Sequence, residues 1–244
     1  GGSGMLGKSL QKILPNATYL SSKDYNLTRE QEVINMYYQH KPTCVIHLAA
    51  KVSGIQANIA QPLTHYEDNV LMNTLLLKYA RTFRVSQFVA ILSTCIYPDV
   101  VPQYPLTEEM LHLGPPTPTN FSYGYAKRSM AVQIDACNKQ YGTNYSYLIP
   151  CNIFGEHEKS GTAAHFLGAL LHKMAYAIKN NEKSIYLLGT GKPLRQFVYA
   201  GDVAAIIKEV VEKNITTNMN IAPKETFSIA QLALLTMNAC DMMD

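Results

Sequence analysis

The sequence predicts an α/β fold, a Rossmann-like doubly wound parallel sheet to which a smaller, incomplete lobe is attached. Short apolar runs alternate along the chain with longer stretches of helical periodicity, the pattern of strands joined by right-handed helical crossovers. The run at 45–48 is nearly continuous, which is typical of parallel strands covered on both faces. The 244 residues, 47% of them hydrophobic and 16% charged, suffice for one large core with a small second lobe.

The first half of the chain begins the expected alternation of helices and strands. In order, we expect a helix at 8–13, a strand at 18–21, a helix at 29–40, a strand at 43–49, a helix at 65–83 and a strand at 87–93. The start of the second helix has the clearest signal, because Thr28 is suited to an N-cap position and Gln31 follows three residues later.

The second half continues the pattern after a long loop. We expect a helix at 123–140, a strand at 145–149, a helix at 162–179, strands at 184–188 and 196–199, and a helix at 202–213. The loop at 98–122 is rich in proline, and its place directly before Tyr123 favours a loop that covers a site. The alternation loosens between 154 and 194, so this part is expected to belong to the second lobe.

Composition excludes several classes of protein. The net charge is only +3 and no basic run occurs, so we expect neither nucleic acid nor a membrane surface as a partner. No apolar stretch approaches the roughly 20 residues of a membrane span, and the first residues do not resemble a signal peptide. The five cysteines form no C-x-x-C pair, so we expect no metal site and a reducing, cytoplasmic setting.

A glycine motif opens the chain. Gly1, Gly4 and Gly7, with Met5 and Leu6 between them, form G-x-x-G-x-x-G ahead of a helical stretch. Glycines let the backbone approach a pyrophosphate at a helix N-terminus, although a glycine-rich linker is the alternative interpretation of the first four residues. Such a motif should follow a strand, and none precedes it. The sequence is therefore expected to be a fragment of a longer protein that lacks this first strand.

The second expected strand is followed by residues that favour NADP(H) over NAD. An acidic side chain at this place selects NAD, whereas a basic one suits the 2′-phosphate of NADP. Here the chain has Ser21, Ser22 and Lys23, two hydroxyls and a cation. A solvated turn is the alternative interpretation, and the adjacent Asp24 weakens the cofactor assignment somewhat.

A serine and a tyrosine–lysine pair form the strongest chemical signal. Ser93 ends an apolar run, and Tyr123 and Lys127 stand four apart, on one face of a helix. An ammonium beside a tyrosine is expected to lower its pKa, so that Tyr123 can pass a proton to a carbonyl oxygen that is being reduced, with Ser93 as a second hydrogen-bond donor. Cys95 is the unusual neighbour, because a plain reductase needs no thiol there.

These motifs resemble the GDP-L-fucose synthase family of extended short-chain dehydrogenases/reductases. The most specific match is Ser-Thr-Cys-Ile-Tyr-Pro at 93–98. Further matches run in order through nearly the whole chain, at 1–7, 21–24, 45–50, 123–127, 150–155 and 189–197. The resemblance also implies that the chain stops short of the family's C-terminal end.

The family's activity would make the chain an NADPH-dependent epimerase-reductase. It would convert GDP-4-keto-6-deoxy-D-mannose to GDP-L-fucose by inversion at C3 and C5 and reduction at C4. The resemblance implies that Cys95 is the base and His165 the acid of the inversion, while Tyr123 protonates the C4 oxygen. A 4-epimerase, a 4,6-dehydratase and a catalytically inert nucleotide-binding fragment remain as alternatives. The Thr94-Cys95-Ile96 string lacks the acidic pair of the dehydratases.

The resemblance implies further binding residues and an assembly. Besides the glycine loop, Ser22, Lys23, Ser93, Tyr123 and Lys127, the implied cofactor residues are Asn26, Leu27, Ala49, Ala50, Leu92, Pro150, Asn152, Ile153 and His165. The implied substrate residues are Lys173, Leu188 and Arg195, although Leu188 stands where the family often has an aromatic residue. The NADP-binding domain would span 1–153 and 196–222, and the substrate-binding lobe 154–195 and 223–244. A homodimer would form through the helices at 65–83 and 123–140.

Overall fold

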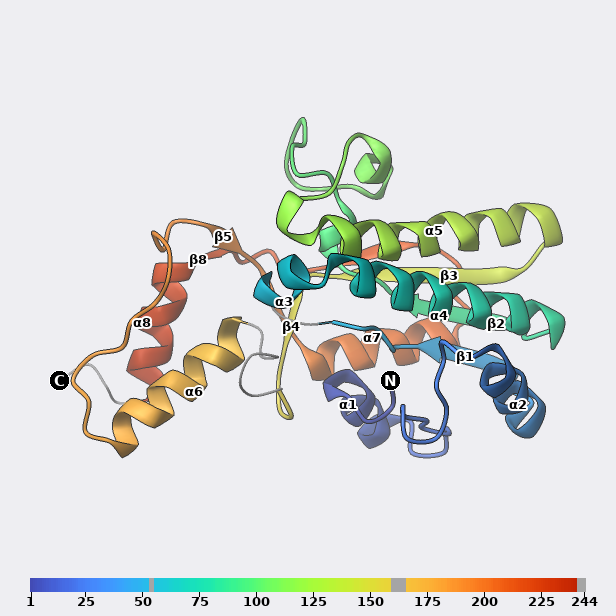
Figure 1. Ribbon diagram of the computed structural model, residues 1–244, viewed down its shortest axis with the longest axis horizontal. Helices are drawn as coiled ribbons and strands as arrows, with labels where there is room; N and C mark the ends of the chain where they lie inside the picture. The colour runs from blue at the N-terminus through green and yellow to red at the C-terminus, as the bar shows by residue number, and fades with distance from the viewer. Residues whose placement is uncertain (53–54, 159–165, 241–244) are drawn as a thin grey trace.

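The computed structural model, which describes residues 1–52, 55–158 and 166–240, has a parallel sheet at its centre (Figure 1). Among these residues the sheet contains four strands in the order β1 (Cys44–His47), β2 (Gln87–Ile91), β3 (Asn144–Pro150) and β7 (Met219–Ile221). All neighbours are parallel, with Val45 beside Phe88 and Phe88 beside Tyr145. The predicted fold class is confirmed.

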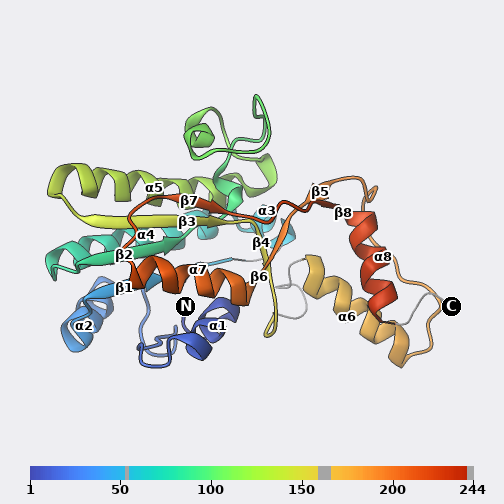
Figure 2. The same cartoon turned by 180° about the vertical axis from the view of Figure 1, so that it is seen from behind.

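Helices cover both faces of the sheet. α4 (Pro62–Thr82) and α5 (Phe121–Tyr141) lie on one face, whereas α1 (Met5–Ile13) and α7 (Ala200–Glu212) lie on the other (Figures 1 and 2). α2 (Glu30–His40) packs against α4 through the buried Tyr37, whose hydroxyl donates to the Leu76 carbonyl over 2.9 Å. The side chains of β2 point alternately into the two cores, and the whole strand is buried, as its apolar sequence predicts.

A smaller lobe lies beyond the carboxyl end of the sheet (Figure 2). It contains α6 (Phe166–Lys179), α8 (Ile229–Ala239) and the antiparallel pair β5 (Leu194–Arg195) and β8 (Phe227–Ser228). Leu170 and Met174 of α6 pack against Ala233 of α8. β4 (Asn152–Phe154) and β6 (Phe197–Tyr199) pair in parallel where the chain passes from the sheet to this lobe.

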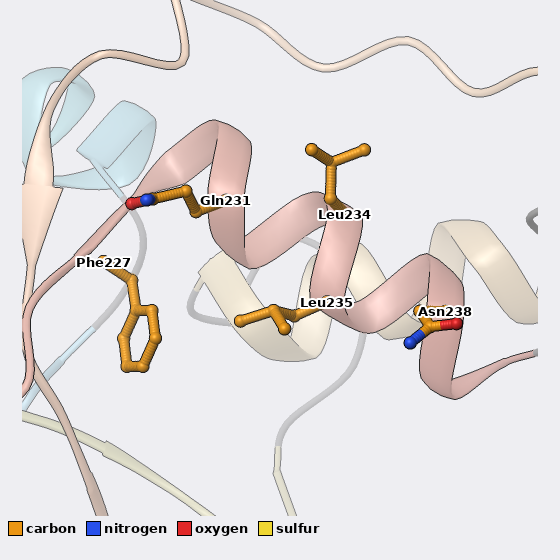
Figure 3. A pocket seen from close by; sticks show the side chains of 5 residues that line it. All are labelled: Phe227, Gln231, Leu234, Leu235 and Asn238. Atoms are coloured by element: carbon orange, nitrogen blue, oxygen red, sulfur yellow. The ribbon is translucent and has the colours of Figure 1, made fainter.

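The outer face of α8 carries a shallow apolar groove of about 410 Å³ (Figure 3). Its lining consists of Phe227, Gln231, Leu234, Leu235 and Asn238. None of the candidate catalytic residues contributes to it, so the groove plays no part in the site described below.

Two predicted strands are wrong. Residues 18–21 do not form a strand, and the Leu20 carbonyl accepts a hydrogen bond from the Gly2 amide over 2.9 Å. Residues 184–188 are also outside any strand, because the segment lies at the surface of the lobe. There Tyr186 is 89% exposed, and its carbonyl accepts from the Lys173 ammonium. Apolar residues in these stretches therefore did not indicate pairing.

Helix starts also differ from prediction. α2 begins at Glu30 with Arg29 as its N-cap, because the Thr28 amide and hydroxyl bond the Asn26 side chain instead. The sequence did not predict α3 (Ile55–Ala60), α8 or the short strands β4, β5, β7 and β8. α8 begins with a capping box in which Ser228 and Gln231 bond each other's backbone amides. The proposed helix start at 162 lies outside the described residues.

Candidate active site

The turn that follows β2 carries Ser93 and Cys95. Leu92 continues the strand with one bond to the Leu148 carbonyl over 2.8 Å, and the chain then forms a 3-10 turn, Thr94–Ile96. Ser93 caps this turn, because its hydroxyl accepts from the Cys95 amide over 3.3 Å. The Cys95 sulfur accepts from the Asn120 Nδ2 over 3.7 Å. Ser93 and Cys95 are thus held in one tight turn at the carboxyl end of a buried strand.

α5 brings Tyr123 and Lys127 to the same strand end. Both side chains are buried, with 7% and 2% of their surface exposed. The Lys127 ammonium donates to the Ile91 carbonyl over 3.0 Å, which anchors it two residues before Ser93. The structure therefore gathers Ser93, Cys95, Tyr123 and Lys127, which the sequence places on two separate segments.

Burial sets the charge states of this pair. It raises the pKa of the Tyr123 hydroxyl well above its usual value, and the neighbouring Cys95 raises it further. It lowers the pKa of Lys127 to about 8. The expectation that Tyr123 has a lowered pKa is therefore wrong for this structure, because burial disfavours the charged phenolate. Tyr123 is protonated near neutral pH and can donate that proton.

Two buried polar residues, His47 and Asn73, lie near Lys127. Neither was predicted from the sequence to have a role in the site. The Asn73 Nδ2 donates to the Ala126 carbonyl over 3.3 Å, so its Oδ1 accepts from His47 Nε2 over 2.9 Å. Burial, followed by the charge of Lys127, lowers the pKa of His47 to about 3. His47 is therefore neutral, with its proton on Nε2. The sequence signal that could have identified His47 is its place as a polar residue in the otherwise apolar run at 45–48.

The glycine loop fits a close turn against the sheet. A Cβ added at Gly1 would lie 2.6 Å from the Ala49 amide nitrogen, and one added at Gly7 would lie 2.4 Å from the Gly2 carbonyl oxygen. Only glycine allows both approaches. Gly4 is the N-cap of α1, so the first amides of the helix, on Met5 and Leu6, lie beside this turn. Such a cradle fits the pyrophosphate of a dinucleotide.

The turn at 21–24 leaves a cation exposed. The Asp24 Oδ2 accepts from the Ser21 amide and hydroxyl, each over 2.7 Å, and these bonds lower the pKa of Asp24. Its carboxylate is thus engaged within the turn, while Ser22 and Lys23 are exposed. Asn26 and Leu27 follow, with Leu27 packed against the core. Because Asp24 is bonded within the turn and Lys23 is exposed, Asp24 weakens the case for a 2′-phosphate less than the sequence suggested.

The remaining cofactor candidates lie at the carboxyl ends of β1 and β3. Ala49 and Ala50 follow β1, and Asn69 of α4 fixes the next residue by accepting from the Lys51 amide over 2.9 Å and donating to the Lys51 carbonyl over 3.0 Å. Pro150 ends β3, whereas Asn152 and Ile153 belong to β4. These residues share the sheet edge of Ser93, where doubly wound folds bind their ligands.

The predicted substrate residues lie in the smaller lobe. The Lys173 ammonium donates to the Tyr186 carbonyl over 2.8 Å, and Leu188 is 94% exposed. The Arg195 guanidinium donates to the carbonyl of Leu194 over 2.7 Å. Within the described residues no hydrogen bond joins these three to the Cys95 turn. The remaining candidate, His165, lies outside the described residues.

A cavity of about 310 Å³ opens beside Tyr123, between α3 and the start of α5. Its lining consists of Asn58, Ile59, Pro62, Pro118, Thr119, Asn120, Phe121, Ser122 and Tyr123. Asn120, which reaches Cys95, was missed by the sequence reading, and its amide close to Tyr123 was the only signal. The end of the loop at 98–122 thus lines this cavity, and the middle of the loop is tied to β7, since the Asn220 amide Nδ2 donates to the Leu106 carbonyl over 3.2 Å.

The described residues contain no cluster of three His, Cys, Asp or Glu side chains placed to hold a metal ion. No helix among them is both long and apolar enough to cross a membrane.

Comparisons with known proteins agree on one group. The sequence profile of the NAD-dependent epimerase/dehydratase family matches residues 1–222. The chain is 35% identical to a GDP-L-fucose synthase from Dictyostelium discoideum, over 99% of this chain and 78% of the relative, and 34% identical to a probable GDP-L-fucose synthase from Drosophila melanogaster, over 98% and 80%. The structure is similar to a GDP-L-fucose synthetase from Naegleria fowleri bound to NADP, with a TM-score of 0.91 and 33% identity over all of this chain and 82% of that one.

Proposed function

Because the chain belongs to the NAD-dependent epimerase/dehydratase family, we propose that it is an NADPH-dependent epimerase-reductase that converts GDP-4-keto-6-deoxy-D-mannose to GDP-L-fucose. One observation carries the proposal. Cys95 stands in the same turn as Ser93 and beside Tyr123, so a thiol joins a carbonyl-reducing set of side chains. The sequence similarity to GDP-L-fucose synthases supports the choice of a GDP-sugar substrate.

The chain's own residues would hold NADP(H) along the carboxyl edge of the sheet. Gly1, Gly4 and Gly7 provide the close turn for the pyrophosphate, and Lys23 and Ser22 suit the 2′-phosphate. When bound, the cofactor supplies the hydride for reduction at C4. The NADP-bound relative supports this choice of cofactor.

Reduction at C4 needs a proton for the oxygen that becomes an alkoxide. Tyr123 holds that proton at neutral pH, since burial raises its pKa, and Ser93, in the same turn as Cys95, would donate a second hydrogen bond. The Lys127 ammonium, one helical turn along α5 and held by the Ile91 carbonyl, would stabilise the phenolate that remains after the transfer, although burial keeps Tyr123 protonated before it.

Inversion at C3 and C5 needs a base and an acid on opposite sides of the sugar. The C4 ketone makes both neighbouring C–H bonds acidic, because the carbanion is delocalised into the carbonyl as an enolate. At each carbon Cys95 takes up one proton and His165 donates one to the opposite face, and both groups then regain their starting states by proton exchange with solvent. The position of Cys95 beside Tyr123 supports this assignment, because one bound sugar can then be both inverted and reduced in the same site.

Two further parts of the proposal concern assembly and compartment. A homodimer would use α4 and α5, whose outer surfaces carry Leu71 and Val132, each nearly half exposed. The cytoplasm is the proposed compartment, and the free thiols of all five cysteines, Cys95 among them, suit its reducing conditions.

A single assay tests the activity. The protein is incubated with GDP-4-keto-6-deoxy-D-mannose and NADPH in D₂O, while NADPH absorbance and deuterium at C3 and C5 are followed. We expect NADPH oxidation and two deuterium atoms in a GDP-L-fucose product. Oxidation without deuterium would instead indicate a simple 4-reductase, and the absence of both would indicate a different substrate or an inert chain.

A further inference from the structure

Arg128 follows the catalytic lysine and is almost fully buried, with 6% of its surface exposed. Its Nε donates to the Ile96 carbonyl and its Nη1 to the Gly114 carbonyl, each over 2.7 Å. The first bond holds the peptide unit that ends the turn carrying Cys95. The second holds the long loop at 98–122. One side chain of α5 therefore joins the turn and the loop.

α5 touches the same turn one helical turn earlier. A Cβ added at Gly124 would lie 2.6 Å from the Cys95 carbonyl oxygen and 2.8 Å from the Pro116 Cβ. Gly124 and Arg128 are four residues apart and share a helix face, next to the face of Tyr123 and Lys127. α5 thus presents one pair of residues toward carbonyl reduction and an adjacent pair toward the Cys95 turn.

The charge of Arg128 is unusual for a purely structural contact. Among the described residues no carboxylate lies within ion-pair distance of the guanidinium, and its buried Nη2 has no hydrogen-bond partner. The group instead lies over the Tyr125 ring, 5.2 Å from its centroid. A buried cation without a counterion costs stability. The planar guanidinium of arginine can, however, donate to two carbonyls at once, here those of Ile96 and Gly114.

We propose that Arg128 is a positioning residue for Cys95, which fixes where the thiol stands relative to the sugar carbons that are inverted. The inference rests on the proposed function. Ser93 fixes the Cys95 amide, Gly124 admits the Cys95 carbonyl, and Arg128 fixes the peptide unit that follows. These three contacts restrain the backbone of the turn on both sides of Cys95. The Lys127 ammonium is held by the Ile91 carbonyl and not by the contacts of Arg128, so we expect reduction not to depend on Arg128.

The test compares Arg128→Met, Arg128→Lys and a control, Lys139→Met, on the exposed end of the same helix. Inversion is measured as deuterium uptake at C3 and C5 without NADPH. Reduction is measured on 4-keto sugar that the wild-type protein has already inverted. NADPH affinity is measured by fluorescence titration. We expect Arg128→Met to lose at least about tenfold in deuterium uptake, since small misplacements of a reacting group cost this much.

Reduction of the inverted sugar and NADPH affinity should stay near wild type in Arg128→Met, and Arg128→Lys should recover part of the uptake. If the Met variant does not fold, the Lys variant alone must show reduced uptake with intact NADPH affinity. Unchanged uptake in both, or a parallel fall in uptake, reduction and affinity, would overturn the inference while the wild-type activity stands. A wild-type protein without uptake would overturn the proposed function and this inference together.

Discussion

Cys95 is the residue on which the proposed reaction depends. Its amide is fixed by Ser93, and its sulfur accepts a hydrogen bond from Asn120. The first bond would form with any residue in this turn, but the second is made to the sulfur, which a thiol that only filled space would not need. The geometry therefore favours a role for the sulfur itself.

The first prediction separates inversion from reduction at this residue. Cys95→Ser removes the thiol but keeps a small polar side chain, and His165→Gln removes the partner acid. Each should lower deuterium uptake at C3 and C5 by about a hundredfold or more, within the range of acid–base catalysis. Reduction of sugar that is already inverted should continue in Cys95→Ser. Full uptake in both variants would refute the assignment of base and acid.

The second prediction concerns His47. Its pKa is about 3 in the folded protein and near 6.5 when unfolded, so below pH 6.5 the unfolded chain binds a proton that the folded chain does not. The free energy of unfolding should therefore fall as the pH drops from about 6.5 toward 3, by up to about 1.4 kcal/mol per pH unit. His47→Gln should flatten this slope in urea unfolding at pH 7 and pH 5. The exposed His112→Gln is the control, and an equal slope in both variants would contradict the prediction.

At the scale of the elements, the turn at 21–24 is predicted to select the cofactor. Lys23→Ala removes the exposed cation that suits a 2′-phosphate, while Asp24 stays bonded to Ser21. NADPH affinity should fall about tenfold, the effect of losing roughly 1.4 kcal/mol of binding free energy, and NADH affinity should not change. Lys224→Ala, on an exposed loop, is the matched control. Equal losses for NADPH and NADH would refute the assignment.

The elements also show where sequence reasoning succeeds. The buried strands β1, β2 and β3 were predicted, because parallel strands covered on both faces need continuous apolar runs. The segment at 184–188 has a similar composition but no partner strand in the described residues, and pairing is a property of the whole sheet. β7 was missed for a different reason, because its three residues, 219–221, give too short an apolar signal to stand out.

Some residues of the candidate site were predicted from the sequence and others were not. Ser93, Tyr123 and Lys127 were identified because their spacing on a strand end and a helix carries the signal. Asn120 and Arg128 have no such spacing, and their roles depend on which carbonyl or sulfur the folded chain brings to them. The lowered pKa of Lys127 likewise follows from burial, which the sequence does not state.

At the scale of the whole molecule, the candidate residues divide between two parts. The carboxyl edge of the sheet carries Cys95 and Tyr123, while Lys173 and Arg195 belong to the smaller lobe. A nucleotide sugar is long enough to need both, with its sugar at the sheet and its diphosphate near basic side chains. Arg195 is exposed and, among the described residues, its one side-chain hydrogen bond goes to the neighbouring Leu194 carbonyl, which suits a guanidinium that meets such a ligand.

The last prediction tests the proposed dimer. α4 and α5 lie side by side, and Gln133 donates to Thr74 across their exposed side over 3.0 Å. Val132 on this surface is 49% exposed, and burying such a side chain contributes about 1.5–3 kcal/mol. Val132→Asp should therefore shift the protein from dimer to monomer in sedimentation velocity. Val100→Asp, in the loop at 98–122 and not on α4 or α5, is the control; this side chain is 83% exposed, and the change should leave the dimer intact. A monomeric wild type, or a Val132→Asp variant that still sediments as a dimer, would place the interface elsewhere.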